Sequence, residues 1–154
     1  MPEMSFQLKS PAFENGATVP AKHSCEGEDV SPELAWGDPP EHTRSFALIV
    51  DDPDAPGGTF THWVLFDIPG AARGLAEGAS DVGVAAANDF GMAGYGGPCP
   101  PPGDGKHRYL FKLFALDRES LNLSKGASRA DVERAMDGHV LSQIQLMGTY
   151  QRGR

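Results

Sequence analysis

Glycine and proline divide the sequence into short pieces, and this constrains the fold more than any other feature. The chain of 154 residues contains 19 glycines and 13 prolines. They stand between apolar runs instead of forming one tract, which is typical of turns and loops and not of disorder. Many short elements are therefore favoured over a few long helices. The length suits one domain with a substantial core, and we expect residues 1–154 to form it.

Several apolar runs have the composition of β-strands. Residues 45–50 are apolar throughout and end in β-branched side chains, which suits a central strand. A second predicted strand, residues 62–68, is stopped by a Pro-Gly pair, and a third, residues 108–116, contains one lysine. In a short predicted strand near the start, residues 6–9, apolar and polar side chains alternate.

One helix is predicted near the C-terminus. Ser128 stands three residues before Asp131, the spacing of a helix N-cap with its carboxylate partner. Apolar residues then recur at helical spacing up to Gly138. The following residues 140–150 favour a strand, because apolar and glutamine side chains alternate in them. The pattern predicts a mostly β sandwich or barrel with one or two short helices.

The charge and the apolar runs exclude some classes of partner. A net charge of −8 disfavours nucleic acid and anionic bilayers, which are bound by clustered lysine and arginine. No apolar run is long enough to span a bilayer, and residues 1–10 lack the pattern of a secretory signal. A cytoplasmic location is expected. Cys25 and Cys99 fit reduced thiols there, although a disulfide is possible if the fold brings them together.

Polar side chains stand where predicted strands meet loops. Asp52 ends the first long strand, on the face of Phe46, Leu48 and Val50. His62 begins the next strand, on the face of Val64, Phe66 and Ile68. If the two strands pair antiparallel, Asp52 and His62 meet at one end of the sheet. A carboxylate beside a histidine raises the histidine pKa and orients the ring.

A third junction follows a loop rich in glycine and proline, residues 94–103. His107 and Tyr109 are two apart, so on a strand they point the same way and Arg108 points opposite. Prolines stiffen the loop, while Gly96 and Gly97 allow a close approach and expose N–H donors. Two histidines, a tyrosine hydroxyl and free amides predict a site for an anion or a phosphate.

Each junction alone has a structural explanation. Asp54 in a run of aspartate and proline is typical of a turn. A single histidine beside Trp63 is often a structural residue, and Trp36 suits the core. Three such junctions in one chain are more specific than any one of them, and together they indicate a ligand pocket.

At these residues the chain resembles the phosphatidylethanolamine-binding protein family, which includes Raf kinase inhibitor protein. The similarity is carried by residues 52–56, 60–64, 94–103 and 107–109. Residues 97–101, 138–141 and 148–150 resemble the short bacterial and archaeal branch in particular. The resemblance extends from about Cys25 to the C-terminus.

The resemblance implies two antiparallel sheets with a small anion pocket at one end. The family's pocket residues fall on Asp52, His62, His107 and Tyr109, and the loop that lines the pocket on Gly97, Pro98, Cys99 and Pro100. Asp54 matches a second aspartate, which is expected to brace the loop. Phe60 stands where animal members often have tryptophan. Animal members also carry a longer C-terminal segment with a helix beside the pocket, so here a more open pocket, or one covered in a homodimer, is expected.

Three functions compete at this stage. The favoured one is a non-enzymatic protein that binds small anions or phosphate head groups without a cofactor, and modulation of a kinase or protease is expected as its role. A hydrolase or lyase could use Asp52, His62, His107 and Tyr109 for acid–base chemistry, but no Gly-x-Ser-x-Gly motif is present. The third function is a metal site with Asp52, His62 and His107 as ligands, but the sequence lacks the tight ligand spacing typical of such sites.

Overall fold

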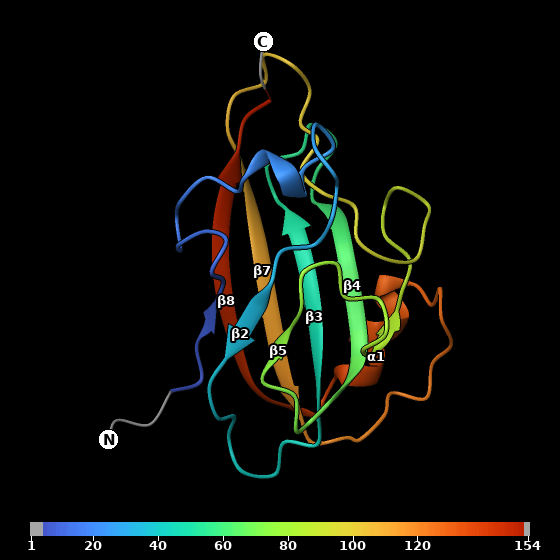
Figure 1. Ribbon diagram of the computed structural model, residues 1–154. Coiled ribbons are helices and arrows are strands. Elements are labelled where there is room, and N and C mark those ends of the chain that lie inside the picture. The colour runs from blue at the N-terminus through green and yellow to red at the C-terminus, as the bar shows by residue number, and fades with distance from the viewer. Residues whose placement is uncertain (1–4, 153–154) are drawn as a thin grey trace.

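The computed structural model describes residues 5–152 (Figure 1), so part of the segment searched for a signal lies outside the described residues. Two antiparallel sheets make up the protein, as the resemblance implied. The smaller sheet has the order β1-β2-β5, with β1 at Leu8–Lys9, β2 at Leu34–Trp36 and β5 at Gly74–Leu75. The larger sheet has the order β6-β4-β3-β7-β8. Its strands are β6 Val84–Ala85, β4 Phe60–Pro69, β3 Ser45–Asp52, β7 His107–Leu116 and β8 Val140–Tyr150.

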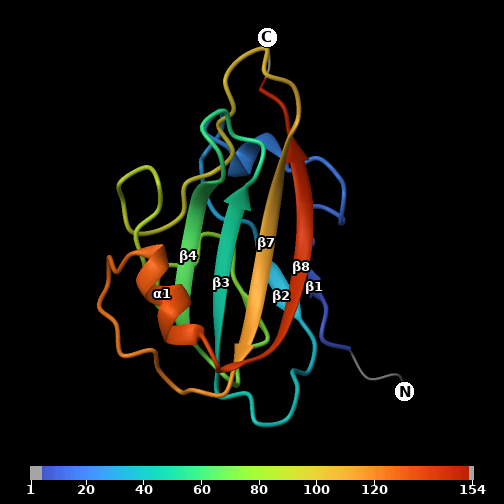
Figure 2. The ribbon, with the colours of Figure 1, turned by 180° about the vertical axis from the view of Figure 1, so that it is seen from behind.

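The larger sheet is covered on both faces. The small sheet lies over one face, and Figure 2 shows helix α1 (Arg129–Met136) against the other face, beside β4 and β3. All eight residues of β3 are buried because it lies in the middle of this arrangement. Phe46 and Leu48 pack between the sheets, whereas Ala47 and Ile49 pack towards α1. Strand alternation thus builds two apolar cores from one strand.

Helix α1 begins where the sequence predicted. The Ser128 hydroxyl accepts a hydrogen bond of 3.0 Å from the Asp131 amide, which satisfies one of the free N–H groups of the first turn. Val132 and Met136 are buried against the sheet. Within residues 5–152, no helix is long and apolar enough to cross a membrane.

Strand β4 contains a bulge at His62. Val50 of β3 pairs with Trp63, and the next residue, Asp51, pairs with Thr61. One step along β3 therefore corresponds to two residues of β4, and His62 is the extra one. The regular alternation of side chains along β4 is interrupted there.

The bulge decides which face of the sheet His62 occupies. Thr61 points to the helix side, where its hydroxyl accepts a hydrogen bond from Arg129, and Trp63 packs between the sheets. His62, next to Thr61, points to the side of Trp63. The predicted alternation, which placed His62 on the face of Val64, is wrong, because Val64 packs under α1.

The sequence missed the shortest elements. Strands β2, β5 and β6 have two or three residues each, too few to show a period, and the 3-10 helix η1 (Ala21–His23) has three. The long strands were all predicted, including β8, and β1 covers only the end of its predicted range.

Cys25 and Cys99 form a disulfide, so the expectation of reduced thiols is wrong. The bond joins the segment after η1 to the Gly/Pro loop before β7. Hydrogen bonds reinforce this junction: the Cys25 amide donates to the Pro98 carbonyl at 3.0 Å, and the Tyr95 hydroxyl donates to the His23 carbonyl at 2.7 Å. The loop is therefore fixed to the rest of the fold at several points.

Candidate functional site

A cavity of about 260 Å³ lies at the end of the larger sheet where β3 ends and β4 and β7 begin. Seven residues proposed from the sequence line it: Asp52, Phe60, His62, Cys99, Pro100, His107 and Tyr109. The remaining lining residues are Ala55, Pro56, Phe90 and Pro101. The three polar junctions of the sequence therefore do converge on one space.

Three proposed residues, Gly97, Pro98 and Asp54, do not line the cavity. The Gly97 amide donates to the Asp29 carboxylate at 2.8 Å, and the Gly96 amide donates to the His62 carbonyl at 3.0 Å. The expectation that these two amides are free for a ligand is wrong. A Cβ on Gly97 would lie 2.0 Å from the His23 carbonyl oxygen, so glycine is needed there for the contact with η1.

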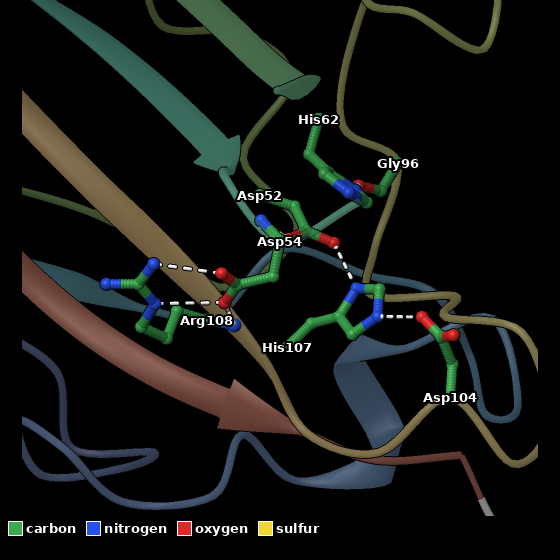
Figure 3. A network of polar contacts seen from close by, with 7 residues as sticks. All are labelled: Asp52, Asp54, His62, Gly96, Asp104, His107 and Arg108. Carbon is green, nitrogen blue, oxygen red and sulfur yellow. Dashed lines mark hydrogen bonds and ion pairs between the residues drawn. The ribbon is translucent and has the colours of Figure 1, made fainter. Parts of the chain in front are cut away.

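His107 lies between two carboxylates (Figure 3). Its Nδ1 is 2.6 Å from Asp52 Oδ2, and its Nε2 is 2.6 Å from Asp104 Oδ2. A neutral imidazole donates from only one nitrogen, so two carboxylate partners favour the imidazolium. Burial opposes the charge, but the hydrogen bonds to Asp52 and Asp104 outweigh it, and the pKa of His107 is raised. The sequence paired Asp52 with His62; the structure pairs it with His107.

Asp52 is held in place from a second side. Its Oδ1 accepts a hydrogen bond of 2.8 Å from the Asp54 amide, which fixes the carboxylate at the end of β3. Both Asp52 and His107 are almost fully buried. The pair therefore holds the His107 ring in one orientation at the cavity, so binding a ligand does not require the ring to lose rotamer freedom.

His62 has a different environment. Its Nδ1 is 2.8 Å from the Gly96 carbonyl oxygen, so this nitrogen carries a proton and donates. Burial lowers the pKa of His62, and the carbonyl of Gly96 and the charge of Asp52 only partly oppose that effect. At neutral pH the ring is therefore uncharged, and its Nε2 is an acceptor.

The Tyr109 hydroxyl is the one buried side-chain polar atom without a hydrogen-bond partner in the part of the chain that the structure describes. Tyr109 is 1% exposed and lines the cavity. Burial raises the pKa of Tyr109 most, followed by the negative charge of the nearby Asp52 carboxylate, which approaches the hydroxyl without meeting hydrogen-bond geometry. The hydroxyl therefore keeps its proton. A buried hydroxyl without a partner is unfavourable by about 1–3 kcal/mol, which a ligand acceptor would recover.

Aromatic rings form one wall of the cavity. The Phe60 ring centroid lies 5.0 Å from that of His62 and 4.8 Å from that of Phe90, and His62 lies 5.2 Å from Tyr109. Phe90 was missed in the sequence because it stands alone in a loop, 42% exposed, without a periodic neighbour. The wall makes the cavity apolar apart from its few polar groups.

Asp54 braces the loop behind the cavity. Its carboxylate accepts hydrogen bonds from the Arg108 amide and guanidinium at 2.8–2.9 Å. Figure 3 shows this pair beside Asp52 and turned away from His62. The hydrogen bonds from Arg108 lower the pKa of Asp54 to about 2. Asp54 thus links the loop after β3 to the start of β7.

Other possible sites carry less chemistry. Among residues 5–152, no group of three His, Cys, Asp or Glu side chains is placed to hold a metal ion. Two larger cavities, of about 740 and 510 Å³, lie at the β1–β8 edge and beside β6. Neither has a histidine among its described lining residues, so the smaller cavity is the candidate site.

Comparison with known proteins identifies the family of the chain. The family described as phosphatidylethanolamine-binding protein matches residues 9–151. A UPF0098 protein of Aquifex aeolicus is 53% identical, over 96% of this chain and 89% of its own length. In three dimensions the chain is similar to a phosphatidylethanolamine-binding protein homologue of Chlamydia trachomatis, with a TM-score of 0.91, 40% identity, and coverage of 97% of this chain and 99% of the other.

A second solved structure, YbcL of Escherichia coli, gives a TM-score of 0.89 and 34% identity, and the match covers 96% of this chain and 99% of that one. Its description places YbcL in the family of the mammalian phosphatidylethanolamine-binding proteins. The chain described here therefore belongs to the phosphatidylethanolamine-binding protein family, in its UPF0098 bacterial and archaeal branch.

Proposed function

We propose that the protein binds a small anion, or the phosphate of a head group, in the 260 Å³ cavity and does not transform it. The observation that carries the proposal is the buried Tyr109 hydroxyl without a partner beside the charged ring of His107. The Tyr109 hydroxyl can donate to an oxyanion directly, and the His107 ring can donate once one of its two carboxylate partners is displaced. Donors to a charged acceptor give strong hydrogen bonds. The neutral His62 ring would accept a hydrogen bond at Nε2 from the P–OH group of a monoprotonated phosphate or phosphate monoester.

Binding is supported over catalysis by the state of the reactive groups. Cys99 Sγ is bonded to Cys25, so it is not a nucleophile, and both nitrogens of His107 are held by carboxylates. A hydrolase or lyase is the second candidate, because the Asp52–His107 pair resembles an oriented acid–base pair. Release of phosphate from phosphoethanolamine during an overnight incubation, abolished by His107→Ala, would favour this second candidate.

Calorimetric titration of inorganic phosphate and of phosphoethanolamine tests the proposal and separates free phosphate from a head group. We expect Tyr109→Phe to weaken binding by about tenfold, the value of one hydrogen bond to a charged group. Tyr95→Phe is the matched control, because the Tyr95 hydroxyl is also buried but donates to His23 outside the cavity. Absence of binding by the wild-type protein, or equal loss in both variants, contradicts the proposal.

The proposed binding depends on pH through His107. Because its pKa is raised, His107 stays charged above the ordinary histidine range, and affinity falls as pH rises through that raised value. His62 is not expected to add to this decrease, since burial already keeps it neutral. A sulfate titration isolates the protein's contribution, since sulfate itself does not change charge over this range.

Three further expectations belong to the same proposal. A kinase or protease target has no identified surface here and stays a prediction, to be tested by pull-down from the native host. For the homodimer we propose the edge strand β8, where Val140 and Leu141 are exposed. The cytoplasmic location also stays a prediction, and the Cys25–Cys99 disulfide does not support it, because such bonds are more common in oxidising compartments.

A further inference from the structure

Asp104 holds the ring nitrogen of His107 that Asp52 leaves free, although Asp104 itself does not line the cavity. The contact with Asp52 uses Nδ1 of His107, a residue that lines the cavity, so a ligand that binds this ring must take Nε2. In the structure the Asp104 carboxylate accepts from that nitrogen at 2.6 Å (Figure 3). A carboxylate and an oxyanion ligand have the same charge sign and the same acceptor geometry, so both cannot hold Nε2 at once.

The turn that carries Asp104 is exposed and loosely packed. Gly103 and Gly105 flank it, both with φ of +80°, and a Cβ on either would meet nothing within 4 Å. The Asp104 side chain is 40% exposed, compared with 2% for His107 and 4% for Asp52. Release from His107 would return the Asp104 carboxylate to water, and the charge of the buried ring would then be balanced by Asp52 and by the bound anion. Asp52 has no such freedom, because its second oxygen is held by the Asp54 amide.

We propose that Asp104 is a tethered competitor that occupies Nε2 of His107 in the empty site and is displaced when an anion binds. The inference rests on the anion-binding function proposed above. Asp104 lowers the affinity in two ways: only the fraction of molecules with Asp104 released can bind, and a retained negative charge repels the ligand. It also favours strongly charged oxyanions over weak acceptors, because only they replace a carboxylate on this ring.

The experiment compares wild type, Asp104→Asn and Asp104→Ala in calorimetric titrations with sulfate at pH 6.0 and fixed ionic strength. At this pH the raised pKa keeps His107 charged in the wild type, and an NMR titration measures its charge in the variants. We expect both variants to bind sulfate about fivefold more tightly than the wild type. Asp81→Asn is the control for net charge, because Asp81 is exposed and does not line the cavity; it should leave the affinity unchanged.

If both Asp104 variants bind sulfate as tightly as the wild type or less tightly, the inference is wrong. The anion-binding proposal still stands in that case, provided that the wild type binds sulfate. Binding by the variants alone supports it in its strongest form. If no protein binds sulfate, the anion function fails, and the inference about competition fails with it. An NMR titration of His107 without ligand tests whether Asp104 contacts the ring in solution. If it does, Asp104→Asn should lower the His107 pKa.

Discussion

Two neighbouring aspartates at the end of β3, both buried, have opposite environments. Asp51 points to the helix side, where Lys112 Nζ lies 3.2 Å away and the Arg129 guanidinium also donates to it. Asp52 points to the cavity side, where its only charged partner is the titratable His107. Lysine and arginine stay charged across the physiological range, whereas a histidine does not. One strand thus holds a permanent ion cluster on one face and a pH-dependent pair on the other.

The difference between the two aspartates distinguishes a carboxylate that stabilises the fold from one that belongs to a candidate site. The Asp51 cluster joins α1 to β3 and β7, and Asp51 lines none of the three cavities described above. The Asp52 pair borders open space and a hydroxyl without a partner. Burial of a carboxylate alone does not indicate a site; the nature of its partner and the space beside it do.

The largest effect is expected from removal of the Asp51 charge. Asp51→Asn leaves Lys112 and Arg129 half-buried without their anion, and we expect the free energy of unfolding to fall by about 3 kcal/mol. Urea denaturation measures it. Asp38→Asn, which breaks the exposed pair with Arg73, should change it by less than about 1 kcal/mol. Sulfate affinity of Asp51→Asn should stay near the wild-type value. A large loss of affinity would show that the Asp51 cluster also supports the cavity.

The second effect is a pH dependence confined to the Asp52 side. The raised pKa of His107 means that its contribution to stability is complete below the unfolded-state value of about 6.5. That contribution is lost as pH rises through the folded-state pKa. We expect Asp52→Asn to remove most of this loss of stability with rising pH. Urea denaturation between pH 5.5 and 9 measures it. His139→Gln, which removes an exposed histidine paired with Asp117, should retain it.

The smallest effect is expected at the helix that carries Arg129. Ser128→Ala removes the N-cap hydrogen bond and should lower the free energy of unfolding by about 1 kcal/mol. The shift of the urea midpoint relative to Ser80→Ala, at an exposed position, measures it. Sulfate affinity should be unaffected, because the cap supports only the helix side; a loss of affinity would show that α1 also positions the cavity.

The long strands and the helix were predictable because their signals are local. Residues 45–50 form a continuous apolar run, and Ser128 with Asp131 has a recognisable spacing. The pocket residues were found because three of them stand at strand–loop junctions. Their partners were not predictable: His107 could pair with Asp52 only through the antiparallel pairing of β3 with β7, which no local pattern encodes.

Other features lacked any signal in one sequence. Asp104 is one aspartate in a glycine-rich loop, and its contact with His107 depends on the turn that the loop adopts. The disulfide depends on the approach of two segments 74 residues apart. The predicted alternation along β4 failed because an extra residue in one strand changes the face without changing the composition.

The bulge at His62 also sets a limit for protein engineering. Deleting one residue there would restore regular pairing of β4 with residues 48–52 of β3, and we expect the more regular ladder to be at least as stable. The same deletion would remove the histidine from the cavity. Selection of variants for thermal stability alone would therefore favour loss of the site, and a library should be screened for ligand affinity alongside melting temperature.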